Sequence, residues 1–239
     1  MPLNELHLFA GAGGGILGGM LLGHTTVCAV EIEPYCREVL LQRQRDGILP
    51  KFPIWDDVTT FDGTPWRGKV DVVCGGFPCQ DISCAGKGAG LAGERSGLWS
   101  EMVRIIGEIR PRYAFVENSP MLTIRGLDRV LGDLSRLGYN ARWAIVGAES
   151  AGALHKRERI WILAYSNSIR QHSSWITTKR KNWEPSHIES GMDGNGIYWD
   201  ASGDIKPGIC RVVDEVAYGV DRLAAIGNGQ VPEIGRAHV

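Results

Sequence analysis

Cys79 lies in a short loop that directly follows an apolar run of the kind found in buried strands. The run covers residues 70–74, and residues 75–80 read GGFPCQ. Ligand sites in open parallel sheets lie at the carboxyl ends of strands, and a proline stiffens this loop. A thiol placed there can act as a nucleophile once nearby cations or a helix N-terminus give it thiolate character. Two alternatives remain open, namely an inert buried thiol and a metal or cluster site that combines Cys74, Cys79 and Cys84.

Glu117 and Asn118 form a polar pair at the end of another apolar run, residues 113–116. The succession of strands places this pair in the same crevice as Cys79. A buried carboxyl group near a nucleophile has a raised pKa and is a candidate acid. The alternative is an ordinary solvated carboxylate at a strand end.

Arg157 and Arg159 belong to a charged segment, residues 155–159, that precedes the apolar run 160–164. Alternation along an extended chain places the two guanidinium groups on one side. Paired guanidinium groups suit phosphate oxygens or base carbonyls as partners. A solvated charge run, with lysine or arginine paired to glutamate inside the segment, is the alternative.

A glycine-rich turn, FAGAGGG at residues 9–15, follows the first apolar run and opens a helix. Gly13, Gly15 and Gly18 fit the G-x-G-x-x-G pattern, in which glycines allow positive φ and close approach of a cofactor. Glu31 lies 18 residues beyond Gly13, where a carboxylate commonly accepts hydrogen bonds from ribose hydroxyls. Enzymes that use NAD, FAD or S-adenosyl-L-methionine (SAM) share this pattern, and a tight turn without a ligand is the alternative.

Apolar runs and amphipathic stretches alternate along the first two thirds of the chain and predict the elements that position these groups. Strands are expected at residues 6–10, 26–30, 70–74, 113–116, 143–146 and 160–164. Helices are expected at about 14–22, 34–45, 98–109 and 127–137. The alternation predicts an α/β fold in which helices cover both faces of a parallel sheet.

Composition narrows the class of protein. A chain of 239 residues with 44% hydrophobic residues and a formal net charge of −1 is typical of a globular protein, not of one that coats nucleic acid or membrane with its whole surface. No run reaches the roughly 18 apolar residues of a spanning helix, and no basic leader precedes an apolar run. Six cysteines are too few for a secreted disulfide framework. We expect a cytoplasmic protein with reduced thiols and no membrane partner.

Taken in order, these motifs resemble those of the DNA (cytosine-5) methyltransferase family. Residues 93–99 resemble the sequence found in phage and prophage members of that family. Seven motifs match: residues 8–14, Glu31, Asp57, residues 76–80, Glu117 with Asn118, Arg157 with Arg159, and residues 227–232. The resemblance implies a Rossmann-like SAM-dependent methyltransferase sheet, built from residues 1–165 and 209–239. Residues 166–208 would form a short, loop-rich target-recognition region.

The resemblance also implies the chemistry and the residues that perform it. Cys79 would attack C6 of a cytosine flipped out of double-stranded DNA, so that C5 takes the methyl group of SAM, while Glu117 binds the N3 edge and Arg159 the O2 side. The implied cofactor-binding residues are Phe9, Ala10, Gly11, Ala12, Gly13, Glu31, Ile32, Asp57, Val58, Pro78, Leu98 and Asn228. The implied DNA-binding residues are Gln80, Ser83, Arg157, Lys179, Arg180 and Lys181. No metal is expected, and we expect a monomer that acts in restriction-modification or phage DNA protection.

Other functions remain open beside this interpretation. One is a catalytically impaired relative that only binds DNA, with residues 166–208 as a recognition region or as a disordered connector. Another is an NAD(P)-dependent oxidoreductase, which shares only the glycine turn and Glu31. RNA in place of DNA is a further alternative for the substrate.

Three segments depart from the family pattern. His7 stands where the family often has aspartate, and Ile32 replaces the aromatic residue that often follows the ribose-binding acid. Residues 233–239 read EIGRAHV, which a common sequencing adapter encodes in one frame. We therefore expect those residues to be an assembly artefact that stands in place of a native C-terminal helix.

Overall fold

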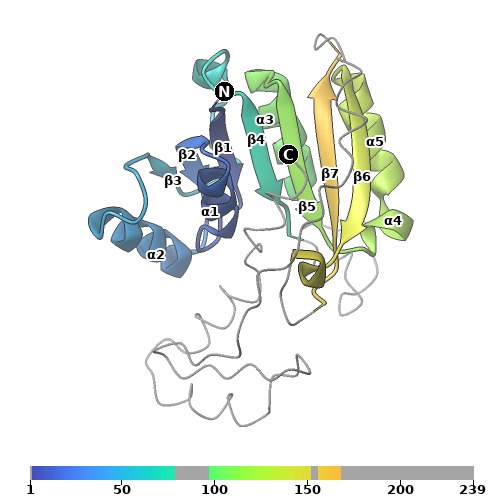
Figure 1. Cartoon of the computed structure of the whole chain (residues 1–239). Coiled ribbons are helices and arrows are strands. Elements are labelled where there is room, and N and C mark those ends of the chain that lie inside the picture. Colours follow the sequence, from blue (N-terminus) through green and yellow to red (C-terminus); the bar gives the residue numbers. More distant parts are fainter. Residues whose placement is uncertain (1, 79–96, 152–155, 168–239) are drawn as a thin grey trace.

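A seven-stranded sheet runs through this computed structural model, which describes residues 2–78, 97–151 and 156–167. The strand order is β3-β2-β1-β4-β5-β7-β6 (Figure 1). The strands are β1 (Asn4–Leu8), β2 (Thr25–Val30), β3 (Ile54–Trp55), β4 (Val72–Gly76), β5 (Tyr113–Asn118), β6 (Tyr139–Val146) and β7 (Arg159–Ser166). All neighbouring pairs from β3 to β5 are parallel, and the order of the strands reverses between β1 and β4.

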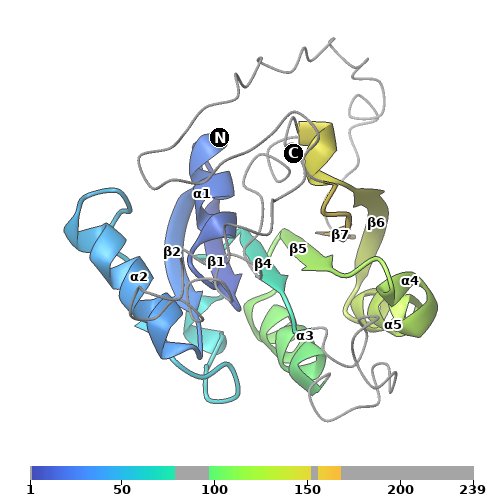
Figure 2. The same cartoon turned by 90° about the horizontal axis from the view of Figure 1, so that it is seen from below.

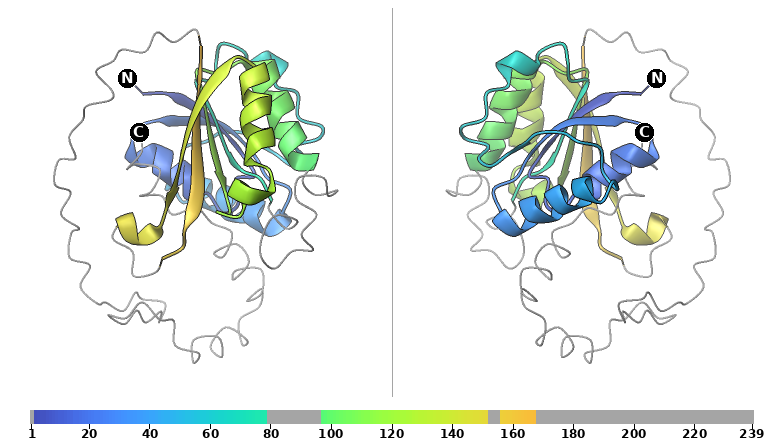
Figure 3. Two further views of the ribbon diagram at one scale, coloured as in Figure 1. Left: turned by 90° about the vertical axis from the view of Figure 1, so that its right-hand side faces the viewer. Right: turned by 90° about the vertical axis from the view of Figure 1, so that its left-hand side faces the viewer.

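Helices cover both faces of this sheet (Figures 2 and 3). One face carries α1 (Gly14–Leu21) and α2 (Pro34–Arg45), and the other carries α3 (Gly97–Ile109), α4 (Leu122–Arg125) and α5 (Leu127–Arg136). Two 3-10 turns complete the elements, η1 (Thr64–Trp66) and η4 (Ala148–Ala151). Within the described part of the chain, no helix is long and apolar enough to cross a membrane.

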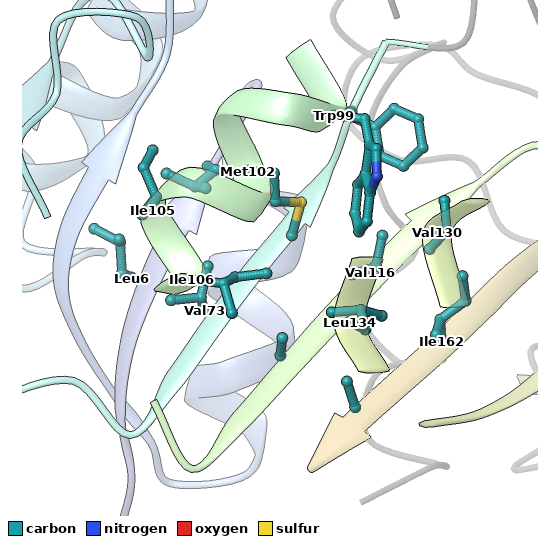
Figure 4. Close-up of a cluster of buried hydrophobic side chains, with 14 of the residues drawn as sticks. Leu6, Val73, Trp99, Met102, Ile105, Ile106, Val116, Val130, Leu134 and Ile162 are labelled. Atoms are coloured by element: carbon teal, nitrogen blue, oxygen red, sulfur yellow. The ribbon is translucent and has the colours of Figure 1, made fainter. Parts of the chain in front are cut away.

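The main core lies between the sheet and the pair α3 and α5 (Figure 4). The buried side chains of α3 are Trp99, Met102, Ile105, Ile106 and Ile109. They recur at helical spacing, so one face of the helix is apolar and packs on the strands. Each fully buried side chain of this size stabilises the fold by about 1.5–3 kcal/mol. The helix expected at 98–109 is therefore confirmed, and its packing fixes β4 and β5 beneath it.

One strand departs from the expected parallel arrangement. β7 is antiparallel to both of its neighbours, β5 and β6. A parallel crossover needs a dozen or more residues and usually an α-helix, whereas the connection at residues 147–158 holds only the short turn η4 among its described residues. β6 and β7 therefore pair as consecutive antiparallel strands, and the sheet is mixed.

Several expected boundaries shift by a few residues. The helix expected at 34–45 matches α2, and Gly138 has the positive φ of a helix C-terminal glycine, 83°. β1 ends at Leu8 and not at residue 10, because the backbone turns at Phe9, where φ is 54°. The strand expected at 143–146 begins earlier, at Tyr139. The recognition region expected at residues 166–208 overlaps β7, because Ser166 is the last residue of that strand. Residues 168–208 of that region and the tail expected at 233–239 lie outside the described residues.

Candidate active site

The polar groups expected to do chemistry lie at one edge of the sheet. Because β1, β4 and β5 are parallel neighbours, their carboxyl ends share that edge. The glycine turn follows β1, the segment Phe77-Pro78 follows β4, and the pair Glu117-Asn118 ends β5. Open α/β sheets bind ligands at the carboxyl ends of the two strands where the strand order reverses, which here are β1 and β4. The sheet therefore brings these segments to the position expected for a ligand crevice.

The glycine turn is fixed by its backbone and by Glu31. Gly11 and Gly13 have φ of 54° and 92°, values that side chains with a Cβ rarely adopt. A Cβ at position 13 would also lie 2.8 Å from Cδ2 of Leu40. The N–H of Gly11 donates to Oε2 of Glu31 at 2.6 Å, and the N–H of Glu33 donates to Oε1 at 2.8 Å.

Glu31 thus stands beside the turn as a carboxylate held by two backbone donors. Its side chain is nearly buried, with 8% of the residue exposed. Each carboxylate oxygen can accept more than one hydrogen bond, so both keep capacity for a further donor. A ribose supplies two neighbouring hydroxyl groups of this kind. The residues around the turn therefore fit the ribose and amino acid ends of a SAM-like ligand.

The other expected cofactor residues differ in how they face this edge. Ile32 is 68% exposed, and Asp57 lies in an exposed turn where its Oδ1 accepts from the N–H and the hydroxyl of Thr59, both at 2.8 Å. These hydrogen bonds lower the pKa of Asp57. The side chain of Val58 is part of the main core, so Val58 can face a ligand only through its backbone. Leu98 packs against the same core.

Glu117 lies near the carboxyl end of β5, where its carboxyl group pairs with an arginine. Its Oε1 lies 2.9 Å from Nε of Arg159, across the antiparallel pair of β5 and β7. Burial raises the pKa of Glu117, and the nearby charges of Arg159 and Arg157 oppose that rise without cancelling it. The interpretation of Glu117 as a solvated carboxylate is wrong, because its side chain is only 14% exposed. Arg159 lies beside this carboxylate. Arg157 precedes β7 and has a φ of 34°, so alternation along an extended strand does not determine its position.

Asn118 joins the two segments of the site that come from neighbouring strands. Its Nδ2 donates to the carbonyl oxygen of Phe77 at 3.0 Å, and its Oδ1 accepts from the N–H of Ser119 at 2.8 Å. The residue is almost completely buried. Sequence reasoning placed Asn118 beside Glu117 but did not assign it this role, and the polar pair at a strand end is the signal that points to it.

A family model for C-5 cytosine-specific DNA methylases matches residues 3–205. The chain belongs to this family. The family expected from the motifs is confirmed, whereas the phage or prophage subtype stays a prediction. Members of this family use SAM as the methyl donor. The alternative of an NAD(P)-dependent oxidoreductase does not agree with this membership.

Curated relatives agree with the family model. The chain is 31% identical over 201 residues to the type II methyltransferase M.CviJI of Paramecium bursaria Chlorella virus IL3A. The matched segment covers 84% of this chain and 49% of that protein. It is also 31% identical over 215 residues to M2.BsuMI of Bacillus subtilis (strain 168), covering 82% and 51%. The chain therefore spans about half the length of the curated relatives it matches.

Solved structures share the fold. The Spodoptera frugiperda DNMT2 mutant E260A/E261A/K263A superposes with a TM-score of 0.58 at 17% identity, over 71% of this chain and 52% of that chain. The S. pombe Dnmt2 methyltransferase superposes with a TM-score of 0.54 at 20% identity, over 69% of this chain and 49% of that chain. At these identities the likeness establishes the Rossmann-like methyltransferase fold alone.

Part of the predicted methyltransferase site lies outside the described residues. These residues are Cys79, Gln80, Ser83, Lys179, Arg180, Lys181 and Asn228. Pro78, the neighbour of Cys79 in the chain, is the last described residue of its loop. Cys28, Cys36 and Cys74 are buried and form no disulfide bond, as expected for structural thiols, and burial raises the pKa of Cys74 well above its ordinary value. The cluster of Cys74 with Cys79 and Cys84 stays untested.

Proposed function

We propose that this chain is the catalytic part of a DNA (cytosine-5) methyltransferase that transfers a methyl group from SAM to C5 of cytosine in double-stranded DNA. The observation that carries the proposal is the half-buried ion pair of Glu117 and Arg159, at the strand end beside the loop that leads to Cys79. A carboxyl group with a raised pKa next to a guanidinium presents a proton donor and a cation to one ligand. The N3 and O2 edge of cytosine needs these two partners.

SAM would be held by the glycine turn and Glu31, with Ile32 and Asp57 beside its adenosine. When bound, SAM supplies an electrophilic methyl group. The Glu31 carboxylate, held in place by the Gly11 N–H, would position it at the end of β1. β1 and β4 are adjacent, so this position lies next to the loop that precedes Cys79.

The proposed reaction begins at Cys79. Its thiolate forms a bond to C6 of cytosine, and the electron pair of the C5–C6 double bond moves toward C5 as Glu117 protonates or hydrogen-bonds N3. C5 would then use this electron pair to bond the methyl group while the methyl–sulfur bond of SAM breaks, so that S-adenosylhomocysteine is the leaving group. A base, acting through water, removes the C5 proton, and the C6–sulfur bond breaks to return the thiolate. The target carbon is inaccessible inside a duplex, so the cytosine must be flipped out.

We further propose that residues 166–208 recognise the DNA target and that the remaining residues form one catalytic domain. Lys179, Arg180 and Lys181 lie in that region among aromatic residues, a composition that suits phosphate contact and base stacking. The family and the sparse cysteines support a cytoplasmic enzyme. Restriction-modification or phage DNA protection is the proposed role, and a monomer the proposed state.

Labelled SAM and duplex DNA test this function. Transfer of label to DNA, its loss in Cys79→Ser, and its persistence in Cys36→Ser are the expected results. Duplexes that contain 5-fluorocytosine should form a stable covalent adduct, because the proton at C5 is replaced and Cys79 cannot be eliminated. DNA binding without transfer by the wild-type chain would support the impaired relative, and transfer to RNA alone would overturn the substrate.

A further inference from the structure

A second group of reactive side chains lies on the α1 face of the sheet, apart from the Glu117 crevice. Glu5 and His7 alternate with Leu6 and Leu8 on β1, so their side chains point to the face opposite the main core. His7 is the register partner of Cys74 on β4, which places that thiol on the same face. The Glu5 carboxylate, a ring nitrogen of His7 and the Cys74 sulfur all lie within 4.8 Å of one another.

His24 adds a fourth side chain from the turn after α1. Its Nδ1 lies 2.6 Å from Oε1 of Glu5, while Nε2 of His7 lies 3.0 Å from Oε2. α1 approaches closely here because Gly19 has no side chain, and a Cβ at that position would collide with the Glu5 carboxylate. We call these four residues, Glu5, His7, His24 and Cys74, the β1 cluster.

The β1 cluster is buried and rich in metal-ligand atoms. Glu5, His7 and Cys74 are each at most 7% exposed, and the His24 side chain is 9% exposed, so the cluster reaches the surface only at His24. Carboxylate oxygen, imidazole nitrogen and thiolate sulfur are the three donor types that bind zinc in proteins. A surface cluster of acids would not indicate a metal site, but buried ligands of mixed type from three separate segments of the chain do.

Charge adds a second argument. The Glu5 carboxylate and a Cys74 thiolate would place two negative charges close together in a buried site, and a buried charge is costly unless it is compensated. A divalent cation that binds the Cys74 thiolate would balance two negative charges with two positive ones. The cluster then becomes neutral.

We propose that the β1 cluster binds one divalent transition-metal ion of the zinc class. The ligand atoms of Glu5, His7 and Cys74 lie within 4.8 Å of one another, whereas His24 contacts only Glu5 among them and would have to move toward the other two to become the fourth ligand. With His24 in place, four protein ligands leave no open position, so the site is structural and not catalytic. Such an ion would tie β1 to β4 at the register pair His7 and Cys74, and it would fix α1 through His24. These are the two strands that lead into the glycine turn and into the loop before Cys79.

Metal binding would change the protonation of the ligands. The Cys74 thiol would lose its proton to solvent as the metal–sulfur bond forms. Each imidazole would bind through the lone pair of the nitrogen that now faces Glu5 and would carry its proton on the other ring nitrogen. Metal–ligand bonds of about 2.0–2.3 Å set ligand atoms roughly 3.3–3.8 Å apart in a tetrahedron. The His7–Glu5 and His24–Glu5 contacts would therefore open by about 1 Å or less.

Titration of the metal-stripped full chain with Co²⁺, which reports its ligands by absorbance, tests the site. We expect one equivalent to bind with a thiolate-to-cobalt charge-transfer band, and one equivalent of Zn²⁺ to displace it. Cys74→Ser should abolish the band. Cys28→Ser, a buried strand thiol whose neighbours lie in the main core, should retain it, and so should Cys79→Ser, which separates this site from catalysis.

A second variant tests the site if Cys74→Ser does not fold. His24→Gln changes the ligand nearest the surface and should weaken Co²⁺ binding at least 10-fold, with circular dichroism used to confirm the native fold. Absence of stoichiometric binding by the wild-type chain would overturn the proposal. So would a charge-transfer band that persists in folded Cys74→Ser, or equal affinity in folded His24→Gln.

Discussion

The side-chain amide of Asn118 donates to the backbone carbonyl of Phe77 at 3.0 Å, so the end of β5 holds the segment that leads to Cys79. The two residues are 41 positions apart in the chain, and both are buried. The bond couples the strand that carries Glu117 to the loop proposed to carry the nucleophile. Asn118 is therefore a positioning residue in the proposed reaction.

Asn118→Ala should slow methyl transfer more than it weakens SAM binding. The substitution leaves the buried Phe77 carbonyl without its donor, which costs about 1–3 kcal/mol of stability. We expect single-turnover methylation to fall at least 10-fold while the dissociation constant for SAM changes by less than 3-fold. Ser119→Ala is the matched control and should keep the wild-type rate. Equal losses in rate and in SAM affinity would point to a general structural defect.

Glu117→Gln should change the dependence of stability on pH. The folded-state pKa of Glu117 is raised above the ordinary value of 4.5, so its contribution to stability is complete below that value and is lost as pH rises through the folded pKa. Glutamine resembles the protonated form at every pH. The variant should therefore gain stability relative to wild type between pH 4 and pH 8, as measured by urea unfolding.

Glu38→Gln is the control for this measurement. Glu38 is 68% exposed in its side chain, and its carboxylate lies 3.9 Å from Arg45, so little pH dependence is expected. A relative stability of Glu117→Gln that falls as pH rises would contradict the raised pKa.

Gly13→Ala should destabilise the chain more than Gly11→Ala. Both positions have positive φ, which costs an L residue about 1–2 kcal/mol. At position 13 the new methyl group would also press on the buried Leu40, and overpacking adds about 1–3 kcal/mol, whereas no atom lies within 4 Å of a Cβ at position 11. Urea unfolding of both variants checks the order. Equal losses would mean that Leu40 moves aside freely.

Glu31→Ala should weaken SAM binding about 10- to 150-fold. The substitution removes an acceptor for two backbone donors and for the proposed ribose hydroxyls, and a hydrogen bond to a charged group contributes about 1.5–3 kcal/mol. Titration calorimetry with SAM measures the change. Glu33→Ala, two residues along the chain and exposed, should bind SAM as the wild type does. An unchanged affinity in Glu31→Ala would remove Glu31 from the proposed site.

The sequence predicted those features that depend on local pattern. The apolar spacing of α3 predicted its buried face, and the proline at position 34 predicted the first turn of α2. Only the resemblance to the methyltransferase family implied that Glu117 and Arg159 serve one ligand, because the parallel sheet expected from the sequence would have placed them at opposite edges. Strand direction was not predictable in this way, since a fully apolar run such as residues 160–164 is the same pattern in either direction.

Contacts between segments that are distant in the chain could not be predicted from the sequence either. Alternation placed Glu5 and His7 on one side of β1, but only the register of β1 against β4 adds Cys74, and only the short path of α1 adds His24. In the same way, nothing near Asn118 in the chain indicates Phe77 as its partner. Such pairs depend on which strands become neighbours, a property of the whole sheet.

The reversed direction of β7 decides where its first residue ends up. β7 has eight residues, so its two ends are about 23 Å apart. Had β7 run parallel to β5, Arg159 would sit at the opposite edge of the sheet, and Glu117 would face Ser166, a residue with no charge. The antiparallel direction of β7 therefore places Arg159 beside Glu117. If β7 alone were reversed and every other strand kept its place, Glu117 would lose this cationic partner.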